Sequence, residues 1–427
     1  MGRQSTPVTA RAAALEIVRT LRGAGHIAYF AGGCVRDELL GLSPTDYDVA
    51  TDATPERIRS LFKRTNEVGE AFGVVLVTLA VPEGGPQVET VEVATFRTDG
   101  PYTDKRRPDS VTFGSAEQDA RRRDFTVNAL FLDPLQPSEP GSQVAGRVID
   151  LVNGRPDLGS RIIRAVGDPD ARLSEDHLRA LRAVRLAARL AFTIEPATAA
   201  AITRHTSDLR GVSRERIGEE MRRMFAHPSR AAAATLLEQL RLDAPVLEEP
   251  PMRRSGSALS NLPTSSPSYP TCLAAWALDR GLALQDSAID ALVRRYRSAL
   301  CLSNDERDEL AATLRALEIL ETQWTSLRIS GQKRLAGRHP GFPGGLALFT
   351  ARNPTAAAAV TTCIEALKAT PSGLCPEPLL TGDDLVAAGW KPGPAFKQLL
   401  EDVYDAQLED RVRTPAEAME LAGRFRV

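Results

Sequence analysis

The chain has 427 residues and a net charge of −2, with 43% hydrophobic, 25% charged and 5% aromatic residues. The length leaves room for two or more domains, and the sparse aromatics favour helices over a β-sandwich. The net charge excludes a uniformly basic protein that coats nucleic acid. No apolar run reaches the roughly 18 residues that a membrane span needs, so we expect no membrane partner.

The N-terminal stretch and the cysteines both indicate the cytoplasm. Arg11 and Glu16 interrupt the first apolar stretch, which argues against a signal peptide. The five cysteines, at positions 34, 272, 301, 363 and 375, have no Cys-x-x-Cys spacing, and the five histidines are isolated. We therefore expect reduced thiols and a cytoplasmic protein.

The first motif follows a predicted helix over residues 9–24. Residues 27–30 predict a short strand, two glycines follow, and residues 35–40 predict the opening of a helix. A glycine turn that opens a helix is a ready anion site, because its N–H groups are unpaired and can approach a ligand closely. Gly33 and Arg36 are therefore candidates for binding phosphate, although a Gly-Gly pair is most often a plain turn.

A pair of acidic residues comes ten residues later. Asp46 and Asp48 are two apart, so on a strand their carboxylates point to the same face, where like charges call for a cation. Carboxylate oxygens together with substrate phosphates suit Mg²⁺. An Asp-x-Asp pair is often a solvated strand edge, but its position after a phosphate-binding turn predicts two-metal phosphoryl or nucleotidyl transfer.

Residues 73–81 and 88–96 are β-rich and predict a hairpin around a Gly/Pro turn. Glu92 is either a third carboxylate near the metals or a solvent-facing strand residue, and both readings stay open. Residues 97–112 form a polar, charged loop, and a loop of this length is usually functional or mobile.

The segment 120–130 combines apolar residues with a polar set. Arg123 can hold a triphosphate, while Asp124 and Asn128 can bond a ribose hydroxyl and are neighbours if the segment is helical. The alternative is a capped, charged helix start.

Residues 149–158 are turn-rich and predict a boundary between a β-containing part and an all-helical remainder, and the sequence is helical from Asp170 onward. Between Arg172 and Arg230 there are twelve arginines, no lysine and seven acids, which predicts a local basic surface. Arg182 and Arg185 recur on one helical face with Asp176 and Arg179. Asp176, Arg179, Arg182 and Arg185 are therefore candidate site residues in this helical part of the chain.

Asp176 and Arg179 allow a specific hypothesis. A carboxylate accepts and a guanidinium donates, so the pair matches the amino donor and ring-nitrogen acceptor that cytosine and adenine share. Uracil and guanine would leave both groups mismatched, at about 1–3 kcal/mol per buried group. The alternative is an ordinary i,i+3 salt bridge.

Three later segments complete the chain. Residues 213–221 predict a helix in which Glu215 or Glu220 braces the preceding arginines. Residues 243–270 are rich in Pro, Ser and Glu and predict a surface linker or insertion. Residues 380–394 predict two helices around a Gly/Pro turn, either a plain turn or a site for a backbone phosphate.

Taken in order, these residues resemble the class II tRNA nucleotidyltransferase and bacterial poly(A) polymerase family. The matching segments are Gly32-Gly33-x-Val35-Arg36-Asp37 with Asp46-x-Asp48, the run 122–129, the run 150–158, Glu175-Asp176-x-x-Arg179-x-x-Arg182, and Glu215-Arg216-Ile217-x-x-Glu220. The resemblance covers about residues 25–230, and residues 380–394 are similar to the tRNA-gripping tail of many such enzymes.

The resemblance implies an α+β fold. A nucleotidyltransferase head with a small mixed β-sheet, DNA polymerase β-like, would span 1–150. An all-helical neck (151–230), body (231–370, with the segment 243–270) and tail (371–427) would follow.

The resemblance also implies roles. Asp46 and Asp48 would be catalytic and hold two Mg²⁺ ions; Gly33, Arg36 and Arg123 would hold the triphosphate; Asp124 would bind ribose; Asp176 and Arg179 would read the base; Arg182 and Arg185 would support the site. The expected activity is template-independent addition of CCA, or part of it, to tRNA 3′ ends from CTP and ATP. Poly(A) polymerase, a CC-adding or A-adding enzyme, and a catalytically silent RNA-binding protein are the alternatives, and the oligomeric state stays open.

Overall fold

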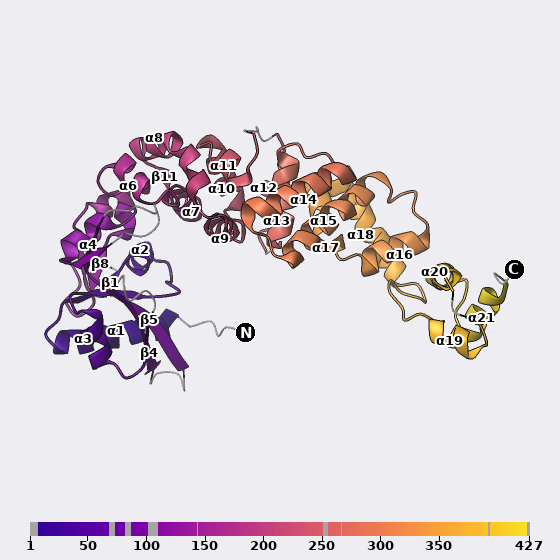
Figure 1. Cartoon of the computed structure of the whole chain (residues 1–427), viewed down its shortest axis with the longest axis horizontal. Helices are drawn as coiled ribbons and strands as arrows, with labels where there is room; N and C mark the ends of the chain where they lie inside the picture. The colour runs from indigo at the N-terminus through magenta and orange to yellow at the C-terminus, as the bar shows by residue number, and fades with distance from the viewer. Residues whose placement is uncertain are drawn as a thin grey trace. The chain divides into compact units, whose positions relative to one another are not determined.

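The computed structural model describes residues 7–67, 73–81, 87–100, 110–142, 144–250, 255–265, 267–391 and 393–424. The chain forms two compact units (Figure 1). Unit 1 comprises residues 1–220 and 239–246, and unit 2 comprises residues 221–238 and 247–427.

Unit 1 is built on a mixed sheet with the strand order β3-β4-β5-β2-β1-β8-β9. Its strands are β1 (Ala28–Ala31), β2 (Asp48–Thr51), β3 (Thr65–Glu67), β4 (Val74–Val81), β5 (Gln87–Thr95), β8 (Phe131–Asp133) and β9 (Arg147–Ile149). β2 and β5 run parallel, whereas the other neighbours are antiparallel. The mixed sheet is confirmed, and so is the hairpin β4–β5, whose turn 82–86 lies outside the described residues.

One face of this sheet is covered by α1 (Pro7–Gly23) and α3 (Pro55–Leu61) (Figure 1). The strand register puts Phe30 opposite Val49, and both are fully buried. Because side chains alternate along a strand, Ala31 and its partner Asp48 belong to the other face. The sheet therefore presents an apolar face to the helices and carries its acidic residue away from them.

Shorter elements connect the strands and shape the second face. They are α2 (Gly33–Leu39), β6 (Arg97–Asp99), β7 (Val111–Phe113), α4 (Ala116–Arg122), the 3₁₀ turn η2 (Thr126–Asn128) and α5 (Gly154–Gly159). β6 and β7 pair with each other, so the ends of the predicted loop 97–112 are ordered, while residues 101–109 lie outside the described residues. A Cβ on Gly154 would lie 2.2 Å from the backbone oxygen of Thr126, so the start of α5 packs where only glycine fits.

The remainder of unit 1 is helical apart from a two-stranded parallel ribbon. The elements are β10 (Ile162–Ile163), α6 (Pro169–Glu175), α7 (Arg179–Leu190), β11 (Thr193–Ile194), α8 (Pro196–Arg204), the 3₁₀ turn η3 (Thr206–Gly211), and α9 (Arg214–Phe225), which continues into unit 2. The prediction of helical structure from Asp170 is confirmed by α6 and α7, but the run is broken after Glu175, where α6 ends. Asp176 is extended and its Oδ1 accepts the backbone N–H of Leu178 (3.1 Å), a local bond that competes with the helix.

Unit 2 is helical throughout its described residues. Its helices are α10 (Arg230–Gln239), α11 (Asp243–Leu247), α12 (Ala258–Asn261), α13 (Tyr269–Asp279), α14 (Asp286–Leu300), α15 (Asn304–Thr322), α16 (Ile329–Arg338), α17 (Phe342–Arg352), α18 (Pro354–Lys368), α19 (Gly382–Ala387), α20 (Ala395–Leu408) and α21 (Pro415–Arg424), with α10 and α11 straddling the division between the units. α13 packs against α15 and α17, and Trp276 is fully buried there. α19, α20 and α21 share a separate apolar core that includes Leu385 and Val403.

The prediction of a surface linker over 243–270 is wrong. This segment contains α11 and α12, and Asp243, Leu247 and Leu259 are buried. Part of the composition reflects a helix start, since Ser268 accepts the backbone N–H of Thr271 and Pro270 lies in the first turn of α13.

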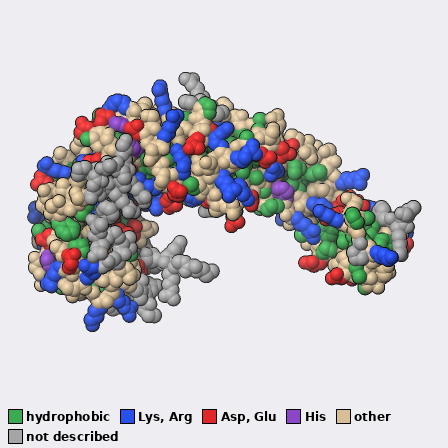
Figure 2. All heavy atoms as spheres, viewed as in Figure 1, with side chains coloured by type: hydrophobic (Ala, Val, Ile, Leu, Met, Phe, Trp, Pro, Cys, Tyr) green, Lys and Arg blue, Asp and Glu red, His purple; other side chains and the backbone are tan. Residues whose placement is uncertain are grey.

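Three further findings concern membrane spans, cysteines and surface charge. Among the described residues no helix is both long and apolar enough to cross a bilayer. The five cysteines all lie in the described residues, and none of them forms a disulfide. On the face visible in Figure 2, basic and acidic side chains are interspersed.

Candidate functional site

A cavity of about 790 Å³ in unit 1 contains every predicted site residue. Its lining includes Gly33, Arg36, Asp46, Asp48, Arg123, Asp124, Asn128, Asp176, Arg179, Arg182 and Arg185. Glu92, Arg97, Asp99, Arg122, Arg189 and Arg216 line it as well. The predicted local basic surface therefore includes a cavity wall, on which most arginines face carboxylates.

Three carboxylates stand on the sheet side of this cavity. Asp46 precedes β2 and Asp48 is its first residue, while Tyr47 between them is buried and donates its hydroxyl to Glu38 Oε1 (2.6 Å). In the parallel pair β2–β5, Val49 aligns with Val93, so Asp48 and Glu92 occupy the preceding positions of the two strands. Asp46, Asp48 and Glu92 thus converge on one space.

The electrostatics of Asp48 report this crowding. Partial burial, and then the carboxylates of Glu92 and Asp46, raise the pKa of Asp48 to about 7 from 3.8. Asp48 nevertheless has solvent-accessible surface, which opens into the cavity. An exposed cluster of three acids whose charges disfavour one another suits a divalent cation with oxygen ligands. The second open reading of Glu92, a strand residue facing bulk solvent, does not fit its place in the cavity.

Arg36 lies beside these carboxylates and is itself buried. Its Nε donates to Asp37 Oδ1 (2.8 Å) and its Nη1 donates to Asn128 Oδ1. Gly32 adopts φ +78°, and a Cβ there would lie 3.0 Å from Arg123 Nη1. Glycine at this turn therefore leaves room for a second guanidinium next to the first.

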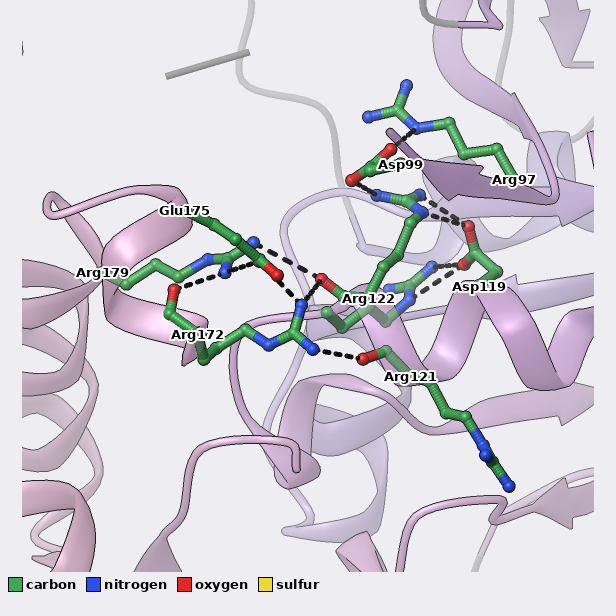
Figure 3. Close-up of polar contacts among 9 residues, drawn as sticks. Arg97, Asp99, Asp119, Arg121, Arg122, Arg172, Glu175 and Arg179 are labelled. Atoms are coloured by element: carbon green, nitrogen blue, oxygen red, sulfur yellow. Dashed lines mark hydrogen bonds and ion pairs between the residues drawn. The ribbon is translucent and has the colours of Figure 1, made fainter. Parts of the chain in front are cut away.

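Arg123 is oriented by a buried acid. Asp119 on α4 accepts from Arg123 Nη2 (3.0 Å). It also accepts from Arg122 Nη2 (2.6 Å), as Figure 3 shows. Burial alone would raise the pKa of Asp119, but the charges of Arg123 and Arg122 outweigh it and lower the pKa. The guanidinium of Arg123 also lies over the Phe131 ring, 5.1 Å from its centroid. Its direction is thus set by its surroundings before any ligand binds.

The predicted ribose-binding residues form a second pair. Asn128 Nδ2 donates to Asp124 Oδ1 (3.2 Å), although α4 ends at Arg122 and the two residues are joined by η2. The two residues are therefore neighbours without being one turn apart on an α-helix, and the alternative of a capped helix start is wrong. Arg182 donates from Nε (2.8 Å) and Nη2 (2.6 Å) to Asp124 Oδ2. Burial would raise the pKa of Asp124, but Arg182 lowers it to about 2.

Asp176 and Arg179 also line the cavity, and each has another partner. Arg216 Nη2 donates to Asp176 Oδ2 (2.7 Å). Arg179 donates from Nη1 to Glu175 and to the carbonyl oxygen of Arg172 (2.7 Å). Among the described residues, then, the ion pair of Asp176 is with Arg216, and the i,i+3 salt bridge of the alternative reading is wrong.

A set of backbone contacts links these residues to the head of unit 1. Arg172 donates to the carbonyl oxygens of Arg122 (3.2 Å) and Arg121 (3.0 Å), as Figure 3 shows, and Arg179 Nη2 reaches the same Arg122 oxygen at 3.4 Å. The predicted brace is confirmed for Glu220, which is buried and accepts from Arg185 Nε (2.7 Å). Arg172 and Arg179 therefore join α6 and α7 to the backbone at the end of α4.

Sequence reasoning missed several lining residues. Arg189 lies one turn after Arg185 on α7, and its Nη2 is 3.5 Å from Asp37 Oδ2. The four-residue spacing was a usable signal for Arg189. The ion pair of Asp176 with Arg216 spans forty positions and leaves no local signal.

Comparisons with known proteins agree with this geometry. A model of the Poly A polymerase head domain matches residues 28–164, and a model described as "Probable RNA and SrmB- binding site of polymerase A" matches residues 191–252. The chain is 34% identical over 409 residues to a CCA-adding enzyme of Limosilactobacillus fermentum, covering 94% of each protein. It is 42% identical over 232 residues to one of Geobacillus stearothermophilus, covering 54% of this chain and 53% of that protein.

A solved structure gives the same result. The crystal structure of the Bacillus stearothermophilus CCA-adding enzyme in complex with CTP superposes with a TM-score of 0.74 at 28% identity, covering 99% of this chain and 98% of that chain. Similarity over almost the whole length extends beyond the motifs into the helical unit 2. The chain therefore belongs to the CCA-adding enzymes, a family of class II tRNA nucleotidyltransferases.

Proposed function

We propose that the chain adds CCA to the 3′ ends of tRNA, taking cytidine and adenosine nucleotides from CTP and ATP without a template. The observation that carries the proposal is the cavity in which a carboxylate trio faces the same space as Asp176 and Arg179. The CCA-adding relatives that match along 94% of this chain support it.

The acidic side of the cavity fits the metal chemistry of nucleotidyl transfer. Asp46 and Asp48 hold two Mg²⁺ ions, with Glu92 as a further ligand or charge partner. When bound, these ions supply activation of the RNA 3′-hydroxyl and neutralise the leaving pyrophosphate. The raised pKa of Asp48 supports this assignment, because the three acids repel one another until a cation is present.

Arg36 and Arg123 bind the triphosphate. Each guanidinium is already held in place, Arg36 by Asp37 and Asn128 and Arg123 by Asp119 and the Asn128 carbonyl oxygen. Little rotamer freedom is therefore lost when phosphate oxygens bind the remaining donors. Gly33 lets its backbone approach the phosphates.

Asp124 and Asn128 orient the ribose. The carboxylate of Asp124 is anchored by Arg182, and a carboxylate has about four lone-pair sites, so it can still accept from a ribose hydroxyl. The Asn128 oxygen joins this pair to Arg36, which couples the ribose subsite to the triphosphate subsite.

Asp176 and Arg179 read the base. Asp176 accepts the exocyclic amino group of cytosine or adenine, while Arg179 donates to the adjacent ring nitrogen. Asp176 is paired with Arg216 and Arg179 is paired with Glu175, so the two side chains are oriented independently of each other. The tail, residues 371–427, is the proposed tRNA-binding part, built on the apolar core of α19, α20 and α21.

The test offers each single nucleotide with Mg²⁺ to tRNA transcripts that lack A, CA or CCA. We expect CTP to extend the transcript lacking CCA by two residues, and ATP to extend only the transcript that ends in CC. Long A tails on any RNA would instead identify a poly(A) polymerase, and addition of C alone or of A alone would identify a partial enzyme. Turnover by the Asp46→Ala, Asp48→Ala variant equal to that of the wild type would refute the metal assignment.

A further inference from the structure

Unit 1 carries a histidine cluster that the nucleotidyl-transfer site does not use. His177 lies between α6 and α7, His205 is the C-terminal cap of α8, and Asp208 lies in η3. One ligand atom from each residue lies within 4.8 Å of the others. Two isolated histidines of the sequence are thus brought together with a carboxylate by the fold.

The geometry points to a metal site. His205 Nδ1 lies 2.8 Å and His177 Nδ1 lies 3.8 Å from Asp208 Oδ2. Ligand atoms of a tetrahedral Zn²⁺ site are separated by roughly 3.4 Å, given bond lengths of roughly 2.0–2.1 Å, so these spacings bracket the required value. We propose that His177, His205 and Asp208 bind a divalent transition-metal ion of the Zn²⁺ class, with a fourth position open to water.

A second carboxylate, that of Asp170, is a hydrogen-bond acceptor for the ring nitrogen of His205 that does not face Asp208. His205 Nε2 lies 3.1 Å from Asp170 Oδ1, so one ring nitrogen donates to Asp170 while the other is directed to Asp208. Such an outer carboxylate fixes the tautomer and orientation of a ligating histidine. Arg204 in turn donates to both oxygens of Asp170 (3.1 and 2.6 Å), which anchors the carboxylate and balances its charge.

Burial and access also fit. His177 is only 3% exposed, whereas the side chains of His205 and Asp208 are 22% and 37% exposed. An ion can therefore enter from the solvent side and meet one ligand that the core holds still. Imidazole nitrogen with one carboxylate suits Zn²⁺ and its neighbours, while Mg²⁺ prefers oxygen alone. The carboxylate trio and this cluster are thus expected to sort the two kinds of ion.

The site has a consequence for nucleotide selection, which rests on the proposed function. His177 directly follows Asp176, the residue that we assign to the base. A metal bound at His177 would hold the segment between α6 and α7 in place.

The test measures binding and not activity, so it succeeds or fails independently of the proposed function. Chelator-treated full-length protein is equilibrated with one equivalent of Zn²⁺ in excess Mg²⁺, and the affinity is read by competition with a chromophoric chelator. We expect one Zn²⁺ per chain, a loss of affinity of at least about tenfold in His205→Ala and Asp208→Asn, and of about 10–100-fold in Asp170→Asn. His26→Ala is the matched control, because His26 also faces a carboxylate, that of Asp52 at 3.3 Å, and it should keep wild-type affinity.

Two outcomes would overturn the proposal: wild-type protein that retains no Zn²⁺ under these conditions, or His205→Ala and Asp208→Asn variants that bind it as tightly as the wild type. Circular dichroism of each variant shows whether it is folded. Co²⁺ gives a second readout, since the wild type should develop the visible absorption of a low-coordinate nitrogen and oxygen site and the near-isosteric Asp208→Asn variant should not.

Discussion

Arg216 offers the sharpest test of base selection by side chains, because its guanidinium donates to the carboxylate of Asp176, the residue that we assign to the base. Its Nη2 lies 2.7 Å from Asp176 Oδ2, and the two side chains are 21% and 15% exposed. Replacing Arg216 by Met keeps much of the aliphatic stem and removes only the donor. The Leu178 N–H would still hold Asp176 Oδ1, so the carboxylate would be loosened and not released.

The expected size of the effect follows from this contact. A hydrogen bond to a charged group contributes about 1.5–3 kcal/mol. Partial exposure places this one in the lower half of that range. Since about 1.4 kcal/mol corresponds to a factor of ten, Arg216→Met should lower the preference for CTP over UTP, as the ratio of their kcat/KM values, by about tenfold.

The assay measures single-nucleotide addition to tRNA lacking CCA with CTP and with UTP at several concentrations. Arg210→Met, an exposed position on η3, is the matched control and should keep the wild-type ratio. The reasoning is refuted if Arg216→Met keeps the wild-type ratio while Asp176→Asn loses it, since Asp176 would then be aimed without Arg216.

Three further predictions concern stability. The pKa of Asp124 in the folded protein, about 2, lies below its ordinary 3.8, so the stabilisation by Arg182 is complete above pH 3.8 and is lost as the pH falls toward 2. Between pH 6 and pH 2, the free energy of unfolding of Arg182→Met, measured with denaturant, should fall by about 2 kcal/mol less than that of the wild type. Equal falls in the two proteins would contradict the pairing. Lys333→Met removes three hydrogen bonds that a fully buried ammonium donates within unit 2. The free energy of opening of α20 should therefore fall by roughly 2 kcal/mol, which is measured as faster hydrogen exchange in that helix. Unchanged exchange would show that Lys333 does not stabilise α20. Gly154→Ala places a Cβ 2.2 Å from a backbone oxygen and should lower the thermal midpoint of unfolding by several degrees. Gly159→Ala on the same helix is the control, because its Cβ meets nothing within 4 Å and the midpoint should not change. Equal midpoints for the two variants would mean that the backbone near Gly154 relaxes at no cost.

The parts of the site that the sequence predicted are those whose partners are near in the chain. The two-residue spacing of Asp46 and Asp48 was readable, because alternation along an extended segment is a local property. The order of the motifs predicted the fold class only through the family resemblance that it supports. Asp124 and Asn128 were correctly expected to be neighbours, although a 3₁₀ turn joins them instead of an α-helix.

The parts that stayed open depend on contacts between distant segments. Whether Glu92 faces Asp46 and Asp48 follows from the parallel pairing of β5 with β2, which joins residues more than forty positions apart. The break at Asp176 has a local cause, an aspartate that bonds the backbone two residues ahead, but the helical periodicity on both sides concealed it. The ion pair with Arg216, in contrast, exists only once α9 has packed against that break.

The composition of residues 243–270 misled for a related reason. Pro and Ser predict an exposed linker, yet Ser268 and Pro270 belong to the start of α13, and Leu247 and Leu259 are buried. Composition alone does not distinguish a capped helix from a loop, because the same residues serve both.

The measurement that tests the central claim most directly is sequencing of the 3′ ends produced from tRNA lacking CCA when all four nucleotides are present at equal concentration. If Asp176 and Arg179 act in place of a template, each wrong base leaves two groups unsatisfied, at about 2 kcal/mol or more in total, so U and G should be rarer than the correct base by at least about thirtyfold, and the products should end in CCA. Ends in which U or G appears nearly as often as C and A would contradict the account.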